Sequence, residues 1–302
     1  MNEKRSSKKV ISLAKRLSEK YDRTSGEIPV REKNNARVIA ITSGKGGVGK
    51  TNIVANLGYA LSKLGKRVLI MDADLGLANL DVLLGLAPKY NFSHVIMGTK
   101  SINEITMKGP GGIEILPASS GIQELTKLTK EQSIRFLTEL DILLDSFDIL
   151  LIDTAAGISS NVMYFNSTAQ EILVIVSPEP TSITDAYALM KVLSLKYSQN
   201  YFKLVVNQAS SKEEALEVYR QLNLVAERFL DISIEYMGHV IHDVNIAKSV
   251  RQQKIVGEIY PDTIASKCFN SLATKIEKSG TTKTPKGNTN FLWKHFLRND
   301  FD

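Results

Sequence analysis

The chain has 302 residues, 43% of them hydrophobic and 23% charged, which suits one α/β domain of about 240 residues with additional segments at both ends. It has no run of about 18 apolar residues and only one cysteine, Cys268, so a transmembrane helix, an internal disulfide and a cysteine-based metal site are excluded. Its net charge of +6 resides in the two ends, because residues 38–277 hold 22 basic and 25 acidic side chains; this balance disfavours nucleic-acid binding by the body of the protein.

The first segment, residues 1–36, is basic and reads as an arm and linker. No apolar stretch of the kind found in secretory signals follows the opening MNEKRSSKK, so we expect a cytoplasmic protein. Residues 8–21, KKVISLAKRLSEKY, have helical spacing that places Val10, Ala14, Leu17 and Tyr21 on one side. A polar stretch containing glycine and proline then leads into a domain predicted to span residues 37–278.

Apolar runs of strand length alternate with helical stretches along this domain. The predicted strands are 37–42, 67–72, 113–118, 147–153, 171–177, 202–207 and 234–241, and the predicted helices are 50–64, 131–146, 181–197 and 212–230. Most of the strands are continuously apolar, as expected for strands covered on both faces. The pattern predicts an α/β fold with a doubly wound, mostly parallel sheet flanked by helices, and ligands at the carboxyl ends of the strands.

The first strand leads into a phosphate-binding loop. Residues 44–51 read GKGGVGKT and satisfy G-x-x-x-x-G-K-[ST] between a strand and a helix. Glycines let the backbone wrap with its N–H groups pointing at phosphate oxygens, and the helix N-terminus adds positive potential. We expect Lys50 to neutralise the β- and γ-phosphates and the Thr51 hydroxyl to bind Mg²⁺. The predicted ATP-binding residues are Gly44, Lys45, Gly46, Gly47, Val48, Gly49, Lys50, Thr51, Asn52, Asp72 and Asn207.

Three carboxylates follow the ends of two other predicted strands. Asp72 is the last residue of the strand 67–72, Asp74 follows two residues later, and Asp153 is the last residue of the strand 147–153. Such carboxylates can order water on Mg²⁺ or orient an attacking water, which is most of what phosphoryl transfer requires of a protein. Gly157 and the small residues after Asp153 suit a loop that rearranges when the γ-phosphate leaves.

These segments resemble one particular family of ATPases. Residues 45–51 match K-G-G-x-G-K-[ST], the deviant Walker A signature of the MinD/ParA family, and DADLGLANLD (72–81) and DTAAGI (153–158) match the two switches of its MinD branch. The resemblance implies that Lys45 reaches across a two-fold axis to the partner subunit's ATP, so that ATP binding forms a homodimer. It also implies that Asp74 orients the attacking water, that Asp153 supports Mg²⁺ from the second shell, and that Asp72 supports the shell of Mg²⁺ and phosphate.

Within this family the chain is most similar to the flagellar placement and number regulators of the FlhG/FleN type. The similarity covers roughly residues 37–270, with Asn52 at a position where division-site members usually have threonine. The similarity implies that Asn207 contacts the adenine. It also implies that the partners of this protein are a signal-recognition-particle-like GTPase and basal-body or transcription-regulator proteins. Flagellar members commonly begin with D-Q-A-x-x-L-R, and residues 1–36 contain no such string.

The C-terminal end combines a linker with an amphipathic stretch. Residues 279–290, SGTTKTPKGNTN, have the composition of a flexible linker. On a helical wheel of residues 291–302, Leu292, Trp293, Phe296 and Leu297 gather opposite Lys294, His295 and Arg298. This pattern predicts a helix that lies reversibly on the inner face of the cytoplasmic membrane. The alternative is a tail that docks into a groove of a protein.

Four other functions compete with a flagellar ATPase switch. Division-site selection uses the same chemistry, and a ParA-type DNA-partitioning ATPase would need basic residues on the body. A metallocluster carrier on the same fold needs bridging cysteines, which Cys268 alone does not provide. A non-enzymatic scaffold would not need Asp74 and Asp153.

His242 and Asp243 follow the last predicted strand, where they could line a base pocket or serve only the fold.

Overall fold

A computed structural model describes residues 36–74, 79–117 and 129–279 of the chain. The predicted N-terminal arm and the predicted C-terminal membrane helix lie outside these residues, as does almost all of the predicted linker before that helix. Among the described helices, none is long and apolar enough to cross a membrane.

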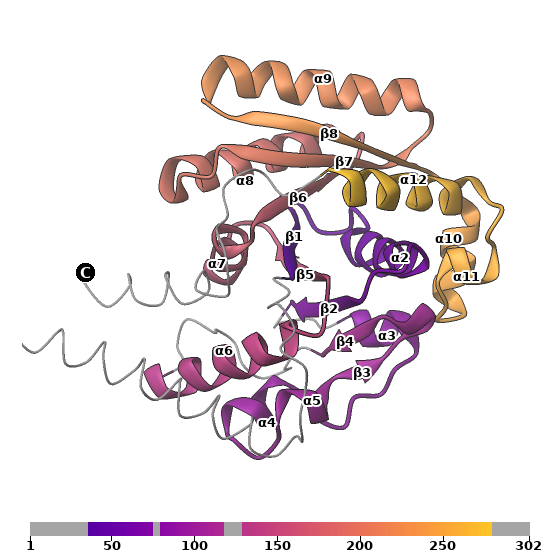
Figure 1. Cartoon of the computed structure of the whole chain (residues 1–302). Helices are drawn as coiled ribbons and strands as arrows, with labels where there is room; N and C mark the ends of the chain where they lie inside the picture. The colour runs from indigo at the N-terminus through magenta and orange to yellow at the C-terminus, as the bar shows by residue number, and fades with distance from the viewer. Residues whose placement is uncertain (1–35, 75–78, 118–128, 280–302) are drawn as a thin grey trace, which may run out of the picture. The chain divides into compact units, whose positions relative to one another are not determined.

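Within the described residues, an eight-stranded sheet in the order β3-β4-β2-β5-β1-β6-β7-β8 forms the centre of the domain (Figure 1). The strands are β1 (Arg37–Ser43), β2 (Val68–Ala73), β3 (Met107–Lys108), β4 (Glu114–Leu116), β5 (Ile149–Ala156), β6 (Glu171–Val176), β7 (Tyr201–Ala209) and β8 (Ser233–Ile241). Neighbouring strands are parallel except for β3 and β4. The predicted doubly wound, mostly parallel sheet is confirmed, and β3 is the strand that the sequence analysis missed.

Helices cover both faces of this sheet. They are α2 (Lys50–Lys63), α3 (Leu80–Leu84), α4 (Phe92–Ile96), α5 (Ile102–Ile105), α6 (Lys130–Leu144), α7 (Ser160–Thr168), α8 (Pro180–Tyr197), α9 (Lys212–Phe229), α10 (Val244–Arg251), α11 (Val256–Ile259) and α12 (Ile264–Lys278), and a 3₁₀ turn spans Pro110–Gly112. One buried cluster joins α2, α11 and α12 to the sheet, and two others lie under α4 to α6 and under α7 to α9. The sheet is therefore buried on both faces, as its apolar strands predict.

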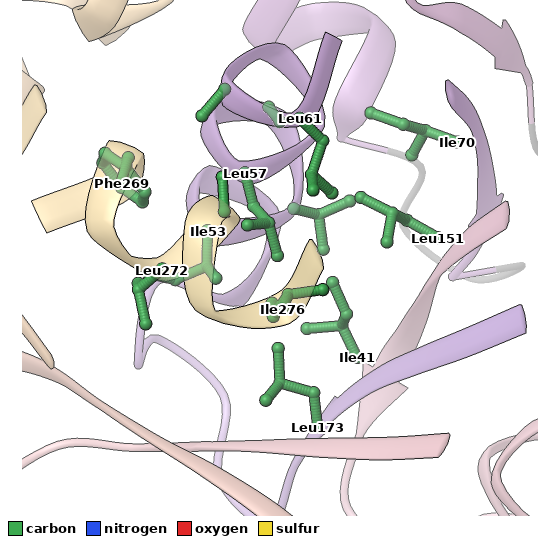
Figure 2. Close-up of a cluster of buried hydrophobic side chains, with 14 of the residues drawn as sticks. Ile41, Ile53, Leu57, Leu61, Ile70, Leu151, Leu173, Phe269, Leu272 and Ile276 are labelled. Atoms are coloured by element: carbon green, nitrogen blue, oxygen red, sulfur yellow. The ribbon is translucent and has the colours of Figure 1, made fainter. Parts of the chain in front are cut away.

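The helix that follows the phosphate loop is held by a large apolar core. Ile53, Leu57 and Leu61 recur every four residues along α2, so they lie on one face of the helix and are almost fully buried. They meet Phe269, Leu272 and Ile276, which form the matching stripe of α12 (Figure 2). Each such side chain stabilises the fold by roughly 1.5–3 kcal/mol when it is buried. The start of α2, where phosphate is expected, is thus fixed to the sheet and to α12.

A buried ion cluster fastens the end of α12 to the amino ends of the strands. Glu171, on β6, accepts hydrogen bonds from the Arg37 guanidinium on β1 and pairs with Lys203 on β7 at 2.6 Å. Arg37 donates also to the carbonyl of Ile276 at 2.5 Å, and both cations donate to the Ser279 hydroxyl, at 3.2 and 2.9 Å. The Lys203 and Glu171 side chains are only 3% and 2% exposed, so each charge depends on its partners. Ser279, the first residue of the predicted linker, is therefore anchored to the domain.

The carboxyl ends of the central strands bring the predicted site together. β1 lies between β5 and β6, and β2 lies on the other side of β5. Asp72 on β2 and Asp153 on β5 are register partners, so their backbones lie side by side. The phosphate loop follows β1 at the same edge. Ligands of open α/β sheets bind at such an edge, where connections leave neighbouring strands in opposite directions.

Candidate functional site

The phosphate loop turns sharply between β1 and α2. Gly47 and Gly49 have φ of +82° and +83°, a left-handed conformation that favours glycine, and Gly49 is the N-cap of α2. Gly46 and Gly47 are exposed, and a Cβ atom at either position would meet no atom within 4 Å. Val48 is instead buried in the core beneath the loop. One side of the loop is therefore open, and a group with phosphate dimensions can approach its backbone there.

The other side of the loop is closed by packing. A Cβ atom on Gly44 would lie 2.2 Å from the backbone carbonyl of Asp185 in α8, so only glycine fits between β1 and that helix. Asn207, at the end of β7, donates a 2.7 Å hydrogen bond from Nδ2 to the Val48 carbonyl and is 5% exposed. Asn52 lies in the first turn of α2, where its carbonyl accepts a hydrogen bond from Asn56. Asn207 thus braces the loop, and its predicted contact with adenine stays a prediction.

Lys50, Thr51 and Asp153 meet below the open side of the loop. The Lys50 ammonium lies 2.6 Å from Asp153 Oδ1, and both side chains are buried, 9% and 2% exposed. Burial raises the pKa of Asp153, and the charge of Lys50 together with hydrogen bonds from Lys50 and Thr51 counteracts the increase. In this arrangement Lys50 is neutralised by a carboxylate, and phosphate oxygens can offer it a second anionic partner.

Asp72 lies against the same cluster from the neighbouring strand. Its two carboxyl oxygens accept hydrogen bonds from the backbone N–H groups of Asp74, at 3.1 Å, and Leu80, at 3.3 Å. Burial, followed by the nearby negative charge of Asp153, raises the pKa of Asp72 to about 7. The site therefore contains a carboxyl group that is partly protonated near neutral pH.

This pKa makes the stability of the nucleotide-free protein depend on pH at Asp72. Between about pH 4 and pH 7 the folded state holds a proton that the unfolded state has lost, so the free energy of unfolding decreases as the pH rises. Asp72→Asn removes the charge but also one of the two hydrogen-bond acceptors, so we expect its effect on the free energy of unfolding to be more favourable at pH 8 than at pH 5 by a few kcal/mol. Urea unfolding at both pH values measures the difference. Equal effects at the two pH values would contradict the protonation of Asp72.

Asp74 and the loop after Asp153 lie at the rim of the site. Asp74 is half-buried at the end of β2, immediately before residues 75–78, which are outside the described part of the chain. Gly157, with φ of +88°, donates from its N–H to the Ser43 carbonyl at 2.9 Å, so the loop after β5 is attached to the end of β1. Ile158, the next residue, is 56% exposed. Both predicted switch segments thus begin beside the phosphate loop.

Lys45 does not point toward its own phosphate site. Its ammonium lies 2.5 Å from Glu179 Oε2 and 2.8 Å from the Thr181 hydroxyl, both at the start of α8. The Lys45 and Glu179 side chains are 35% and 57% exposed, and ion pairs this exposed contribute only about 0–1 kcal/mol. The sequence analysis assigned no role to Glu179 or Thr181.

Other residues that the sequence singled out serve the fold. Asp243 caps α10 by accepting from the Asn245 N–H at 2.9 Å, and its other oxygen accepts from the Ala265 N–H at 3.2 Å, which joins α10 to α12. His242 is exposed and donates its backbone N–H to the Ala209 carbonyl at 2.8 Å. Cys268 packs, partly buried, against the core beneath α12.

The residues fit a magnesium ion that is held mainly by substrate. Among the described residues, no group of three or more His, Cys, Asp or Glu side chains is arranged to hold a metal by itself. Mg²⁺ commonly takes only one or two protein ligands and fills its shell with water and phosphate oxygens. Thr51 and the buried Asp153, hydrogen-bonded to each other, supply that kind of partial site.

Known proteins of several organisms are similar to this chain. The AAA domain family matches residues 36–205. The chain is 42% identical over 262 residues to the antiactivator FleN of Pseudomonas aeruginosa, covering 87% of this chain and 94% of that protein. It is 32% identical over 271 residues to the flagellum site-determining protein YlxH of Helicobacter pylori, covering 88% and 91%. The cell division ATPase MinD of Pyrococcus furiosus has a similar structure, with a TM-score of 0.66, 25% identity and coverage of 81% of this chain and 100% of that chain.

Proposed function

Because this chain belongs to the MinD/ParA-type ATPases of the AAA domain family, we propose that it is an ATP-hydrolysing switch that regulates flagellar placement and number. In this proposal ATP brings two subunits together, the dimer binds the inner face of the cytoplasmic membrane, and slow hydrolysis to ADP releases it. The protein is then cytoplasmic and reversibly peripheral on the membrane.

Nucleotide binding is supported by the open face of the phosphate loop. The exposed backbone at Gly46 and Gly47 leads directly into the start of α2, where Lys50 is buried against Asp153, so phosphate oxygens would meet N–H groups, a helix N-terminus and a cation together. This arrangement is the observation that carries the proposal. When bound, Mg²⁺ would neutralise charge on the β- and γ-phosphates; the Thr51 hydroxyl would bind it, and Asp153 and Asp72 would support its shell of water and phosphate oxygens.

Hydrolysis requires this chain to position a water molecule and stabilise negative charge. Asp74 lies at the end of β2 beside the Asp72–Asp153 pair, where a carboxylate can accept a hydrogen bond from the attacking water. Lys50, which is paired with Asp153, would also contact the phosphates and stabilise their negative charge as it develops. Asp72 keeps the start of the switch in place through its hydrogen bonds to Asp74 and Leu80.

Dimerisation would couple this site to Lys45. The contact of Lys45 with Glu179 and Thr181 is exposed and weak, so it can be given up when a partner's phosphate is available. A charge-assisted hydrogen bond to phosphate contributes more, roughly 1.5–3 kcal/mol. ATP in two facing subunits would therefore draw both Lys45 side chains across the interface.

Membrane binding would then follow from having two C-terminal segments in one dimer. A single short amphipathic helix binds a lipid surface weakly, because ordering its backbone offsets most of the gain from its apolar face. Two copies on one dimer share a single encounter and gain orders of magnitude in avidity. ATP-dependent dimerisation thus becomes ATP-dependent membrane binding through residues 291–302.

A flagellar role is favoured over two related roles by the comparisons. The relatives FleN and YlxH share 42% and 32% identity with this chain over most of its length. Division-site selection, the role of the MinD structure reported above, is the alternative with the same chemistry. We propose a signal-recognition-particle-like GTPase, contacted by the arm 1–36, and basal-body or transcription-regulator proteins as partners. DNA partitioning is disfavoured by the mildly acidic body of the protein.

Deletion of residues 290–302 tests the membrane step. We expect full-length protein to sediment with anionic liposomes in ATP but not in ADP, and the deletion variant to lose at least 90% of this binding, an estimate of about tenfold or more from the lost avidity. Analytical ultracentrifugation in ATP should still show the dimer, since the deleted residues lie outside the ATPase domain. The DNA-partitioning function would be favoured if full-length protein does not bind liposomes but slows the migration of duplex DNA in a gel in a salt-sensitive way.

A further inference from the structure

We propose that the turn between α2 and β2, residues 63–67, is a second contact with an anionic lipid surface, next to the point where the C-terminal segment leaves the domain. The inference rests on the proposed membrane binding and adds a contact that the folded domain itself would make. It is carried by three observations, which are the shape of this turn, its charge and its position.

The turn presents an apolar side chain on a well-ordered backbone. Gly65 adopts φ of +81° after the end of α2, its N–H donates to the Ser62 carbonyl at 2.9 Å, and the Lys66 N–H donates to the Leu61 carbonyl at 3.3 Å. Leu61 is fully buried, but Leu64 is 45% exposed. Leu64 is the C-cap residue of α2, so its exposed side chain stands at the turn itself; one exposed leucine is ordinary on a protein surface, and the proposed contact depends on the charges beside it.

Basic residues flank Leu64 in the sequence, and another ends the neighbouring helix. The turn itself supplies Lys63, Lys66 and Arg67, and the neighbouring end of α12 supplies Lys278. Lys66 pairs with Glu277 at 3.1 Å, and Arg67 pairs with Asp148 at 2.7 Å. No carboxylate among the described residues forms an ion pair with Lys63 or Lys278, so the patch keeps an excess of positive charge. An exposed leucine between lysines is complementary to acyl chains beneath anionic headgroups.

The position of the turn places it beside the C-terminal segment. The Lys66–Glu277 pair joins the turn to the last turn of α12, and Ser279 is fastened there by Arg37 and Lys203. Ser279, the last described residue, therefore lies at the same end of α12 as the contact with the turn. If residues 291–302 lie on a membrane, a linker of about a dozen residues keeps residues 63–67 close to the same surface.

A pair of residues on α8 provides a matched control. Leu195 is 70% exposed and is followed by the exposed Lys196, so the same two residue types are adjacent there. α8 covers the opposite face of the sheet from α2 and α12, as the separate clusters beneath them show. If hydrophobicity and charge alone determined lipid binding, Lys63–Leu64 and Leu195–Lys196 would contribute equally. The proposed contact involves only the turn that contains Lys63 and Leu64.

Liposome binding of the full-length protein in ATP tests the proposal. Loss of one lysine near an anionic surface weakens binding about fivefold, so we expect a loss of about fivefold per subunit of the dimer from Lys63→Ala and about 20-fold per subunit from Lys63→Ala with Leu64→Ser. The control, Leu195→Ser with Lys196→Ala, should bind as wild type does. Both double variants should retain dimerisation and ATPase activity in the absence of lipid. Equal binding of wild type and the turn variant would overturn this inference and leave the proposed function intact.

A fluorescent label gives a second, direct measurement. Because Cys268 is the chain's only cysteine, Leu64→Cys in a Cys268→Ala background takes a single environment-sensitive dye. We expect its emission to shift to the blue on vesicles with anionic lipid and not on neutral phosphatidylcholine vesicles, and the same dye at position 195 to show no shift. Absence of the shift at position 64, on vesicles that the protein demonstrably binds, would overturn the contact. Failure of wild type to bind any vesicle would overturn both this inference and the membrane step of the proposed function.

Discussion

An Asp74→Ala variant should bind ATP about as tightly as wild type and lose hydrolysis by a factor on the order of 10²–10³. The expected loss is large because phosphoryl transfer depends on positioning the attacking water and on electrostatics, and Asp74 is the carboxylate placed at the rim of the phosphate site. Binding should survive, since the loop, Lys50 and Thr51 are unchanged. Single-turnover hydrolysis and equilibrium binding of a fluorescent ATP analogue separate the two effects.

The control for this variant is Asp145→Ala, which removes an exposed carboxylate at the C-cap of α6 and should leave turnover unchanged. Asp74→Ala should also accumulate as a dimer in ATP, because ATP binding still forms the dimer but hydrolysis no longer dissociates it. Near-normal turnover in Asp74→Ala would remove Asp74 from the proposed role. Loss of ATP binding together with turnover would instead indicate that Asp74 supports the loop.

The parts of the fold that the sequence predicts well are those with strong local signals. β1, β2, β5 and β6 are continuous apolar runs, and their burial on both faces follows directly from that composition. The phosphate loop was predicted because its glycines, lysine and threonine have fixed spacing between a strand and a helix. The family resemblance that these motifs suggested is confirmed by the match to residues 36–205 and by the similarity to FleN.

The parts that the sequence did not predict lack a local signal or depend on distant residues. β3 has two residues, and α3, α4, α5 and α11 have five or fewer, which is too short for a helical or alternating period to show. The contacts of Lys45 with Glu179 and of Asn207 with Val48 join residues 134 and 159 positions apart. Only the sheet order, with β1 between β5 and β6, brings such pairs together.

Asp72 illustrates the same limit within the site. Its place at the end of a strand is visible in the sequence, and so is its spacing from Asp74. Its raised pKa depends on burial and on Asp153, which lies beside it only because β2 and β5 are neighbours. Electrostatic properties of a site therefore require the register of its strands in addition to its motif.

The other large effect concerns Lys45. In an Asp74→Ala background, where hydrolysis is suppressed, Lys45→Ala should still bind ATP but should elute from size-exclusion chromatography as a monomer. If Lys45 of each subunit contacts the partner's phosphates, the variant loses two charge-assisted hydrogen bonds worth roughly 1.5–3 kcal/mol each. The dissociation constant of the dimer should then increase by a factor on the order of 10²–10⁴. Sedimentation velocity over a range of protein concentrations measures this change.

Glu179 makes the test more specific, because its carboxylate pairs with Lys45 and, in the proposed dimer, would compete for that lysine with the partner's phosphate. Glu179→Ala in the Asp74→Ala background removes this competing carboxylate. The dissociation constant of its dimer should equal that of Asp74→Ala alone or be up to about fivefold lower, as expected from the loss of an exposed ion pair. Lys191→Ala, at an exposed lysine of the same helix, should change nothing. If Lys45→Ala remains a dimer, Lys45 acts within its own subunit. If Glu179→Ala weakens the dimer as much as Lys45→Ala does, the Lys45–Glu179 pair supports the interface itself, and ATP must draw the subunits together through other residues.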